Sequence, residues 1–169
     1  MATEYKKRIV SVLVENAPNV MTRVSSVLGR RGFNIDTITV STTNNPDITR
    51  ITIVFNVEEQ YIPQIMKQLE KVEVIKKVTL LTRETNLYRE LLLVNLRVGP
   101  EERDRVLNIV RVYKGHVVDL TTTNMVIEMT GYPEKIDGFL EIIQGYTIAD
   151  YTRSGVTAVE SSEQNTKLQ

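Results

Sequence analysis

The 169-residue chain contains no cysteine and no tryptophan, and it has a single histidine. Without cysteine, the sequence excludes disulfides, thiolate nucleophiles and zinc sites with cysteine ligands. Lysine and arginine together number 21, as do aspartate and glutamate, so no net charge attracts nucleic acid or an anionic membrane. A hydrophobic fraction of 41% is ordinary for a folded globular protein.

Long apolar segments are missing as well. No run approaches the roughly 20 residues needed to cross a bilayer, and the polar residues 1–8 lack the apolar stretch and cleavage site of a secretory signal. Residues 160–169 have no periodic apolar pattern, which predicts a flexible tail. We therefore expect a cytoplasmic protein.

The first half of the chain predicts the order β-α-β-β-α-β from its hydrophobic periodicity. Gly32 stands where a left-handed residue ends a helix. The alternation of the following strand slips near Asp36–Thr37, which predicts a bulge. The predicted elements are residues 8–15, 20–31, 33–40, 51–55, 62–69 and 72–81.

The second half repeats this order with little sequence identity to the first. Its predicted elements are a strand at 87–98, a helix from Gly99–Pro100 to 113, a hairpin of 116–121 and 125–130, a helix from Pro133, and one or more strands within 146–159. Such units are ferredoxin-like. We therefore predict an α+β fold of two tandem βαββαβ units, with antiparallel sheets and helices on one face. The predicted domains are residues 1–83 and 84–159, followed by the tail. Because a unit of roughly 80 residues is marginally stable alone, the helix-free faces and sheet edges are predicted partner surfaces.

No catalytic or metal-binding constellation is evident. His116 and Asp119 lie close in sequence, but nothing completes a triad, and neither metal-ligand spacings nor glycine-rich nucleotide motifs occur. Arg30 and Arg31 could bind phosphate but also fit as charges at a helix C-terminus. We therefore expect a regulatory protein without catalytic residues of its own.

The turn from Asn16 to Met21 is the strongest candidate site. It leads into a predicted helix, with Asn19 at the N-cap position, and a helix start offers free N–H donors and partial positive charge to a carboxylate. Asn16 and Asn34 carry acceptors that an ammonium group requires. A zwitterionic amino acid would need both features. The alternative, that the asparagines only cap their own turns, stays open at this point.

These residues resemble a known family. Glu15–Asn16 and the run Arg31-Gly32-Phe33-Asn34-Ile35 look like the ACT domain of the regulatory subunit of acetolactate (acetohydroxyacid) synthase. Arg89-Glu90-Leu91 and Arg153-Ser154-Gly155 extend the resemblance over nearly the whole chain. One position departs from the family pattern, which usually has glycine three residues after its first asparagine. Asn19 stands there, and asparagine is the next most tolerant residue of positive φ.

The resemblance implies a homodimer of ACT domains joined edge to edge, with a branched-chain amino acid, chiefly valine, bound between the chains. The implied effector-binding residues are Asn16, Ala17, Asn19, Val20, Met21, Asn34 and Ile35. It implies no cofactor on this chain, since thiamine diphosphate, magnesium and FAD belong to the catalytic subunit. The protein would bind that subunit, activate it and confer feedback inhibition by valine. The C-terminal unit would add a second dimer contact or a catalytic-subunit contact.

Three alternatives remain at this stage. The chain could be an ACT-type sensor that controls another enzyme, a stand-alone enzyme on a ferredoxin-like fold, or a transcription or RNA-binding module. The last is disfavoured by the sequence, because the predicted central strands lack the aromatic residues on which RNA bases stack.

Overall fold

The computed structural model describes residues 6–29 and 32–161. The chain forms two compact units: the first comprises the residues up to Tyr88 and those from Val156 onward, and the second is Arg89–Gly155. Strand β5 (Asn86–Arg97) starts in the first unit and continues into the second. The domain boundary that we predict after residue 83 stays a prediction.

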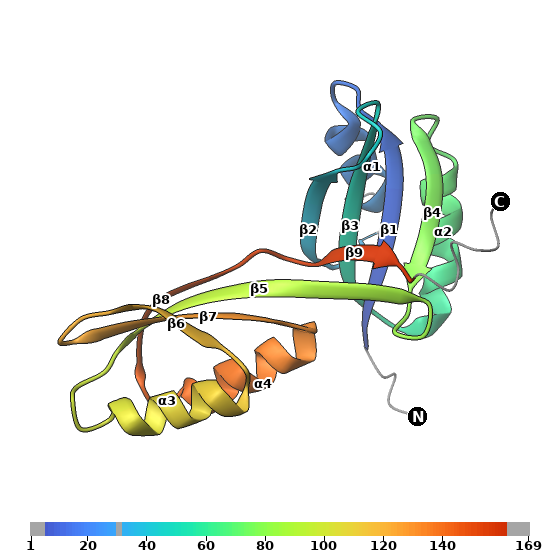
Figure 1. The fold of residues 1–169 in the computed structure, drawn as a ribbon. Coiled ribbons are helices and arrows are strands. Elements are labelled where there is room, and N and C mark those ends of the chain that lie inside the picture. Colours follow the sequence, from blue (N-terminus) through green and yellow to red (C-terminus); the bar gives the residue numbers. More distant parts are fainter. Residues whose placement is uncertain (1–5, 30–31, 162–169) are drawn as a thin grey trace. The chain divides into compact units, whose positions relative to one another are not determined.

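The first unit is a four-stranded antiparallel sheet with the strand order β2-β3-β1-β4 (Figure 1). Its elements are β1 (Lys6–Glu15), α1 (Val20–Gly29), β2 (Ile35–Thr42), β3 (Ile48–Val57), the 3₁₀ turn η1 (Glu59–Tyr61), α2 (Ile62–Glu70) and β4 (Ile75–Leu81). A short strand, β9 (Thr157–Glu160), pairs with β5.

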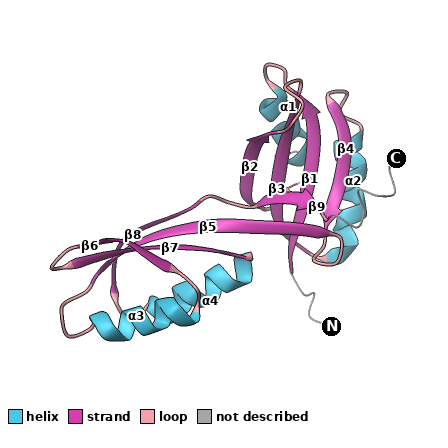
Figure 2. Ribbon diagram, in the orientation of Figure 1, coloured by secondary structure: helices cyan, strands magenta, loops and turns pink. Residues whose placement is uncertain are grey.

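The core of this unit lies between one face of the sheet and the two helices (Figure 2). Alternate residues of β1, such as Val10 and Val12, are fully buried because a strand turns every second side chain to the same face. Val24 and Leu28 of α1, four residues apart, form the matching helical stripe and are also fully buried. The arrangement confirms the predicted unit with both helices on one face.

Local backbone features of the first unit largely follow the sequence. The register between β2 and β3 shifts between Ile35 and Thr37, which confirms the predicted bulge. Gly32 has φ +67°, as expected of a residue that follows a helix. Strand β4 starts at Ile75 rather than at residue 72, because Val72 donates to the Leu69 carbonyl and turns the chain first. Arg30 and Arg31 lie outside the described residues.

The C-terminal strand is tied to the first unit. Glu160 of β9 forms an ion pair of 2.5 Å with Lys77 of β4, and the Ser161 amide donates to the Thr85 carbonyl at 3.1 Å. The strand thus includes the first residue of the predicted tail. Residues 162–169 of that tail lie outside the described part of the chain.

The second unit has the same topology as the first. Its antiparallel sheet has the order β6-β7-β5-β8, so its first strand again lies between the third and the fourth. The elements are β5, α3 (Arg103–Val112), β6 (His116–Leu120), β7 (Asn124–Gly131), α4 (Pro133–Ile143) and β8 (Thr147–Arg153). Helix α3 begins at Arg103, because Gly99 and Pro100 belong to a turn closed by the Glu102 amide on the Gly99 carbonyl. The predicted α+β fold of two tandem units is confirmed.

Candidate functional site

An open hollow of about 390 Å³ lies where β1 ends and α1 begins. It contains five of the seven residues singled out from the sequence: Asn16, Ala17, Asn19, Val20 and Met21. The other lining residues are Val14, Glu15, Thr22, Val40, Thr49 and Ile51.

The start of α1 presents unpaired donors to this hollow. The Asn19 carbonyl accepts the first helical bond, from the Arg23 amide at 3.1 Å, while the amides of Val20, Met21 and Thr22 have no acceptor among the described residues. No acidic side chain lies in the first turn of α1, so nothing within the helix offsets the partial positive charge of its N-terminus. An anion is therefore favoured at this position.

Asn19 adopts the left-handed conformation, with φ +63°. Few side chains tolerate this region, and asparagine is among those that visit it routinely. Pro18 and Asn19 form a turn, and the helix starts immediately after it at Val20. The sequence had placed Asn19 at the N-cap, and its carbonyl does accept the first helical hydrogen bond.

Asn16 holds the loop against the β2–β3 turn. Its backbone amide donates to the Asp47 carbonyl at 2.8 Å, and its Nδ2 donates to the Pro46 carbonyl at 3.1 Å. The side-chain amide nitrogen thus has a structural partner, which lies in the β2–β3 turn and not in the turn that contains Asn16. The Oδ1 atom makes no hydrogen bond within the described chain and can accept one from a ligand.

The buried residues that line the hollow are apolar. Val14, Val20 and Ile51 are buried, whereas Val40 on the outer strand β2 is 51% exposed. Aliphatic side chains and helix-start amides around one hollow suit a ligand with a carboxylate at one end and a small apolar group at the other.

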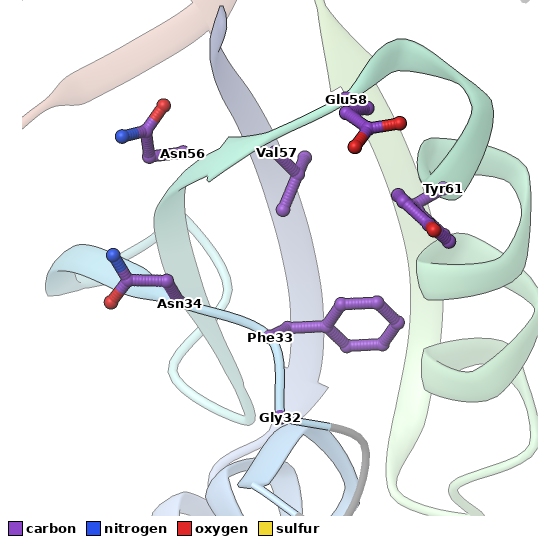
Figure 3. A pocket seen from close by; sticks show the side chains of 7 residues that line it. All are labelled: Gly32, Phe33, Asn34, Asn56, Val57, Glu58 and Tyr61. Atoms are coloured by element: carbon purple, nitrogen blue, oxygen red, sulfur yellow. The ribbon is translucent and has the colours of Figure 1, made fainter. Parts of the chain in front are cut away.

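Asn34 and Ile35 lie elsewhere in the chain. Asn34 lines a second open hollow of about 380 Å³, and Ile35 packs against the core of the first unit. In Figure 3 the side chains of Asn34 and Asn56 lie on the same side of the view, away from the rings of Phe33 and Tyr61. The lining residues are Gly32, Phe33, Asn34, Asn56, Val57, Glu58 and Tyr61. A single chain therefore does not bring Asn34 to the loop after β1.

The two edges of the first sheet differ in their protection. Strand β4 carries Lys76 and Lys77, and these pair with Glu15 and Glu160. Strand β2 has eight residues, and its one charged side chain, Asp36, lies at the bulge. An edge strand with few charged side chains can form hydrogen bonds with a strand of another chain.

The sequence did not reveal an ion-pair cluster in the second unit. Arg153 of β8 donates from Nε and Nη2 to both oxygens of Glu90 on β5, at 2.8 and 2.6 Å, and from Nη1 to Asp137 of α4 at 2.7 Å. Glu90 is only 3% exposed. The hydrogen bonds to Glu90, and then to Asp137, raise the pKa of Arg153 above its ordinary value against the opposing effect of burial. Glu90 and Arg153 both lie in segments that carry the family resemblance, but only the pairing of β5 with β8 shows that the two side chains meet.

The described residues give little support to a catalytic, metal-binding, membrane-spanning or RNA-binding role. His116 is exposed on β6, and no group of three histidine or acidic side chains there could hold a metal ion. None of the described helices is long and apolar enough to cross a membrane. The helix-free faces of the central strands carry residues such as Ser11, Thr52, Leu93 and Val126, with no aromatic among them. That composition argues against the base-stacking surface of an RNA-binding sheet.

Comparisons with known proteins agree with one another. Residues 10–76 match the family model described as an AHAS small subunit-like ACT domain, and residues 89–162 match the model for the small subunit of acetolactate synthase. The chain is 39% identical over 150 residues to the acetolactate synthase small subunit of Mycolicibacterium smegmatis, covering 89% of this chain and 88% of the relative. It is 35% identical over 153 residues to the probable small subunit of Archaeoglobus fulgidus, covering 90% and 96%. The crystal structure of the Thermotoga maritima small subunit superposes with a TM-score of 0.81 at 30% identity, covering 92% and 98%.

Proposed function

The chain belongs to the family of acetolactate synthase small subunits, and from this premise we propose that it senses valine, or a closely related branched-chain amino acid, at the hollow between β1 and α1. The protein is the regulatory component of that synthase, in branched-chain amino acid biosynthesis, and a small subunit implies a catalytic large subunit as partner. The single observation that carries the proposal is the set of free amides at the start of α1, in a hollow that is also lined by buried aliphatic side chains.

The three free amides support binding of the effector's carboxylate. They lie in the first turn of a ten-residue helix whose dipole favours an anion. The Asn16 Oδ1 atom is then the acceptor for the ammonium group. Val14, Val20 and Ile51 would receive the branched side chain, because a short aliphatic group replaces water over apolar surface.

A homodimer formed along β2 would complete the site. In an antiparallel pairing of β2 with its copy, the start of one strand lies beside the end of the other. Ile35 starts the strand and Asn34 precedes it, whereas Val40 near the end lines the first hollow. Two-fold pairing would therefore bring Asn34 and Ile35 of one chain toward the effector hollow of its partner. The β2 edge supports this arrangement, because its one charged side chain lies at the bulge and the rest of the strand is uncharged.

Effector binding would regulate the protein if it favours one arrangement of the dimer over another. We propose that this change of arrangement underlies both activation of the catalytic subunit and feedback inhibition by valine. Residues 1–83 are the proposed sensing and dimerising domain, and residues 84–159 the proposed additional contact with a second chain or with the catalytic subunit. Thiamine diphosphate, magnesium and FAD are assigned to the catalytic partner, and the assembly to the cytoplasm.

Calorimetric titration of the purified chain with L-valine tests the sensing proposal. Saturable binding below millimolar concentration is expected, and D-valine should bind at least tenfold more weakly because its ammonium and side chain exchange positions. No heat at millimolar L-valine would refute the proposal.

Sedimentation of two variants at the middle of β2 tests the dimer. Thr39→Lys should dissociate the dimer, since two like charges would face each other across the two-fold axis, and valine binding should weaken with it. Thr39→Val, which keeps the size and β-propensity of threonine, should remain dimeric. A lysine variant that stays dimeric and binds valine normally would contradict pairing through β2.

A further inference from the structure

The helix-free face of the first sheet is buried, although both helices of that unit pack on the other face. Ile9 pairs with Val54 on the helix-free face, and Ser11 pairs with Thr52. On a bare sheet these four side chains would be open to solvent, yet each is at most 7% exposed. Leu81 of β4, beside Ile9, is buried as well. Another part of the chain therefore covers this face.

A segment that reaches this face follows the second unit. Residues 156–160, which we call the strap, belong to the first unit, where β9 pairs with β5. Val156 and Ala158 are 2% and 3% exposed, whereas the residue on either side of Ala158 is exposed, so one face of the strap is buried. Glu160 pairs with Lys77, which lies on the helix-free face of β4. Figure 1 shows β9 crossing the strands of this sheet.

The strap is attached by few contacts. Its strand has four residues, and its two buried side chains, Val156 and Ala158, are small. The side chains of the Lys77–Glu160 ion pair are 45% and 23% exposed, and such pairs contribute little to stability. Because short segments with few buried contacts open at a lower free energy than the whole domain, the strap can leave the sheet while the sheet stays folded.

The chain enters the strap from a firmly held point in the second unit. Arg153 donates two hydrogen bonds to the carboxylate of Glu90. The amide of Ser154 donates to the Leu91 carbonyl, and the Ser154 hydroxyl accepts from the Leu91 amide, both at 3.0 Å. Gly155 then turns the chain with φ +75°. We call the paired side chains of Glu90 and Arg153, together with Ser154, the clasp.

The clasp determines which side chains of the strap face the sheet. Successive side chains of a strand point to opposite faces, so a shift of one residue would turn Val156 and Ala158 outward. We propose that the strap reversibly closes the helix-free face of the first sheet, and that the clasp sets its register and holds it closed. A change in the second unit that loosens the clasp then opens the first unit, because β9 follows β8 after only three residues.

Thiol labelling tests this proposal, because the natural chain contains no cysteine. Ser11→Cys places a thiol of similar size beneath the strap, and Val12→Cys places one in the core on the opposite face of β1. The second thiol reacts only when the sheet unfolds. We expect the Ser11→Cys protein to be labelled at least about tenfold faster than the Val12→Cys protein. Equal rates would show that the face opens only on unfolding and would overturn the strap.

A matched pair of variants tests the clasp in both labelling backgrounds. Glu90→Gln removes the buried carboxylate, whereas Asp137→Asn changes only the half-exposed partner of Arg153. Glu90→Gln should accelerate labelling of Ser11→Cys by about tenfold or more and leave Val12→Cys unchanged. Asp137→Asn should change neither rate. A parallel rise at both thiols, or none at Ser11→Cys, would contradict the clasp.

A second pair acts on the strap itself and leaves the clasp intact. Ala158→Lys places a charge on the buried face of the strap, and Val159→Lys places the same charge at a side chain that is 54% exposed. Only Ala158→Lys should accelerate labelling of Ser11→Cys, again by about tenfold or more. A thiol that stays protected in the Ala158→Lys protein would refute the strap, whatever the clasp variants do.

Discussion

Replacing Thr22 with glutamate should stabilise the fold and at the same time lower the affinity for the effector. Thr22 is the third residue of α1, is exposed, and lines the effector hollow. Its amide is one of the three free donors. A carboxylate at this position interacts favourably with the helix dipole, by about 0.3–1 kcal/mol. The same carboxylate would compete with, and repel, the carboxylate of a bound amino acid.

The repulsion between the introduced carboxylate and the ligand carboxylate depends on their separation, which is short because both would lie at the first turn of α1. Two carboxylates roughly 6 Å apart repel by about 0.7 kcal/mol at the dielectric constant of water and by about 3 kcal/mol at an effective value of 20. These limits correspond to affinity losses of about 3-fold and about 100-fold. An open hollow lies between the limits, so we expect a loss of about tenfold for Thr22→Glu.

The assay pairs calorimetry with thermal unfolding for Thr22→Glu and its neutral control, Thr22→Gln. The glutamate variant should unfold at the same or a higher temperature than the control and bind L-valine about ten times more weakly. Equal affinities in the two variants would show that the ligand carboxylate does not lie at the start of α1, and the reasoning would fail. A loss of affinity accompanied by a lower unfolding temperature would point to damaged structure instead.

Five further variants, at three places in the fold, probe stability by urea denaturation. Glu90→Gln should lower the free energy of unfolding by about 3 kcal/mol, because it leaves the largely buried Arg153 without its bidentate carboxylate partner. Asp137→Asn, at a half-exposed carboxylate, should lower it by less than about 1 kcal/mol. Equal losses in the two variants would contradict this ranking. Asn19→Ala should lose about 1 kcal/mol because its Cβ is strained at φ +63°, and Asn19→Gly should lose nothing; two variants of equal stability would argue against the left-handed turn. Lys114→Gly, after α3, should gain about 1 kcal/mol by relieving φ +54°, and an unchanged midpoint would count against strain at that position.

Features determined by nearby residues could be predicted from the sequence. The bulge beside Asp36, the glycine after α1 and the helix that starts at Pro133 each depend on a few neighbouring residues, and each is found at its predicted place. The same local reading placed the start of α3 too early. Pro100 suits the first turn of a helix, but the chain makes one more turn before Arg103.

The candidate site could be predicted only in part, because its geometry depends on distant contacts. The run from Asn16 to Met21 is continuous and was identified as one loop. The bond from the Asn16 side chain to the Pro46 carbonyl joins residues 30 positions apart, so the sequence left the role of that amide open. Arg153 and Glu90 are separated by 63 positions and meet only through the pairing of β5 with β8. Neither the sequence around Glu90 nor that around Arg153 indicates that the two residues are in contact.

The open edge of β2 has a consequence for how the sensor behaves at different concentrations. If the effector hollow is completed by residues of a second chain, ligand binding and dimer formation are linked equilibria, and each must strengthen the other by the same factor. Dilution would then weaken valine binding without any change in the site itself, and saturating valine would hold chains together that otherwise separate. The edge would make the abundance of the subunit, as well as that of the amino acid, an input to the response.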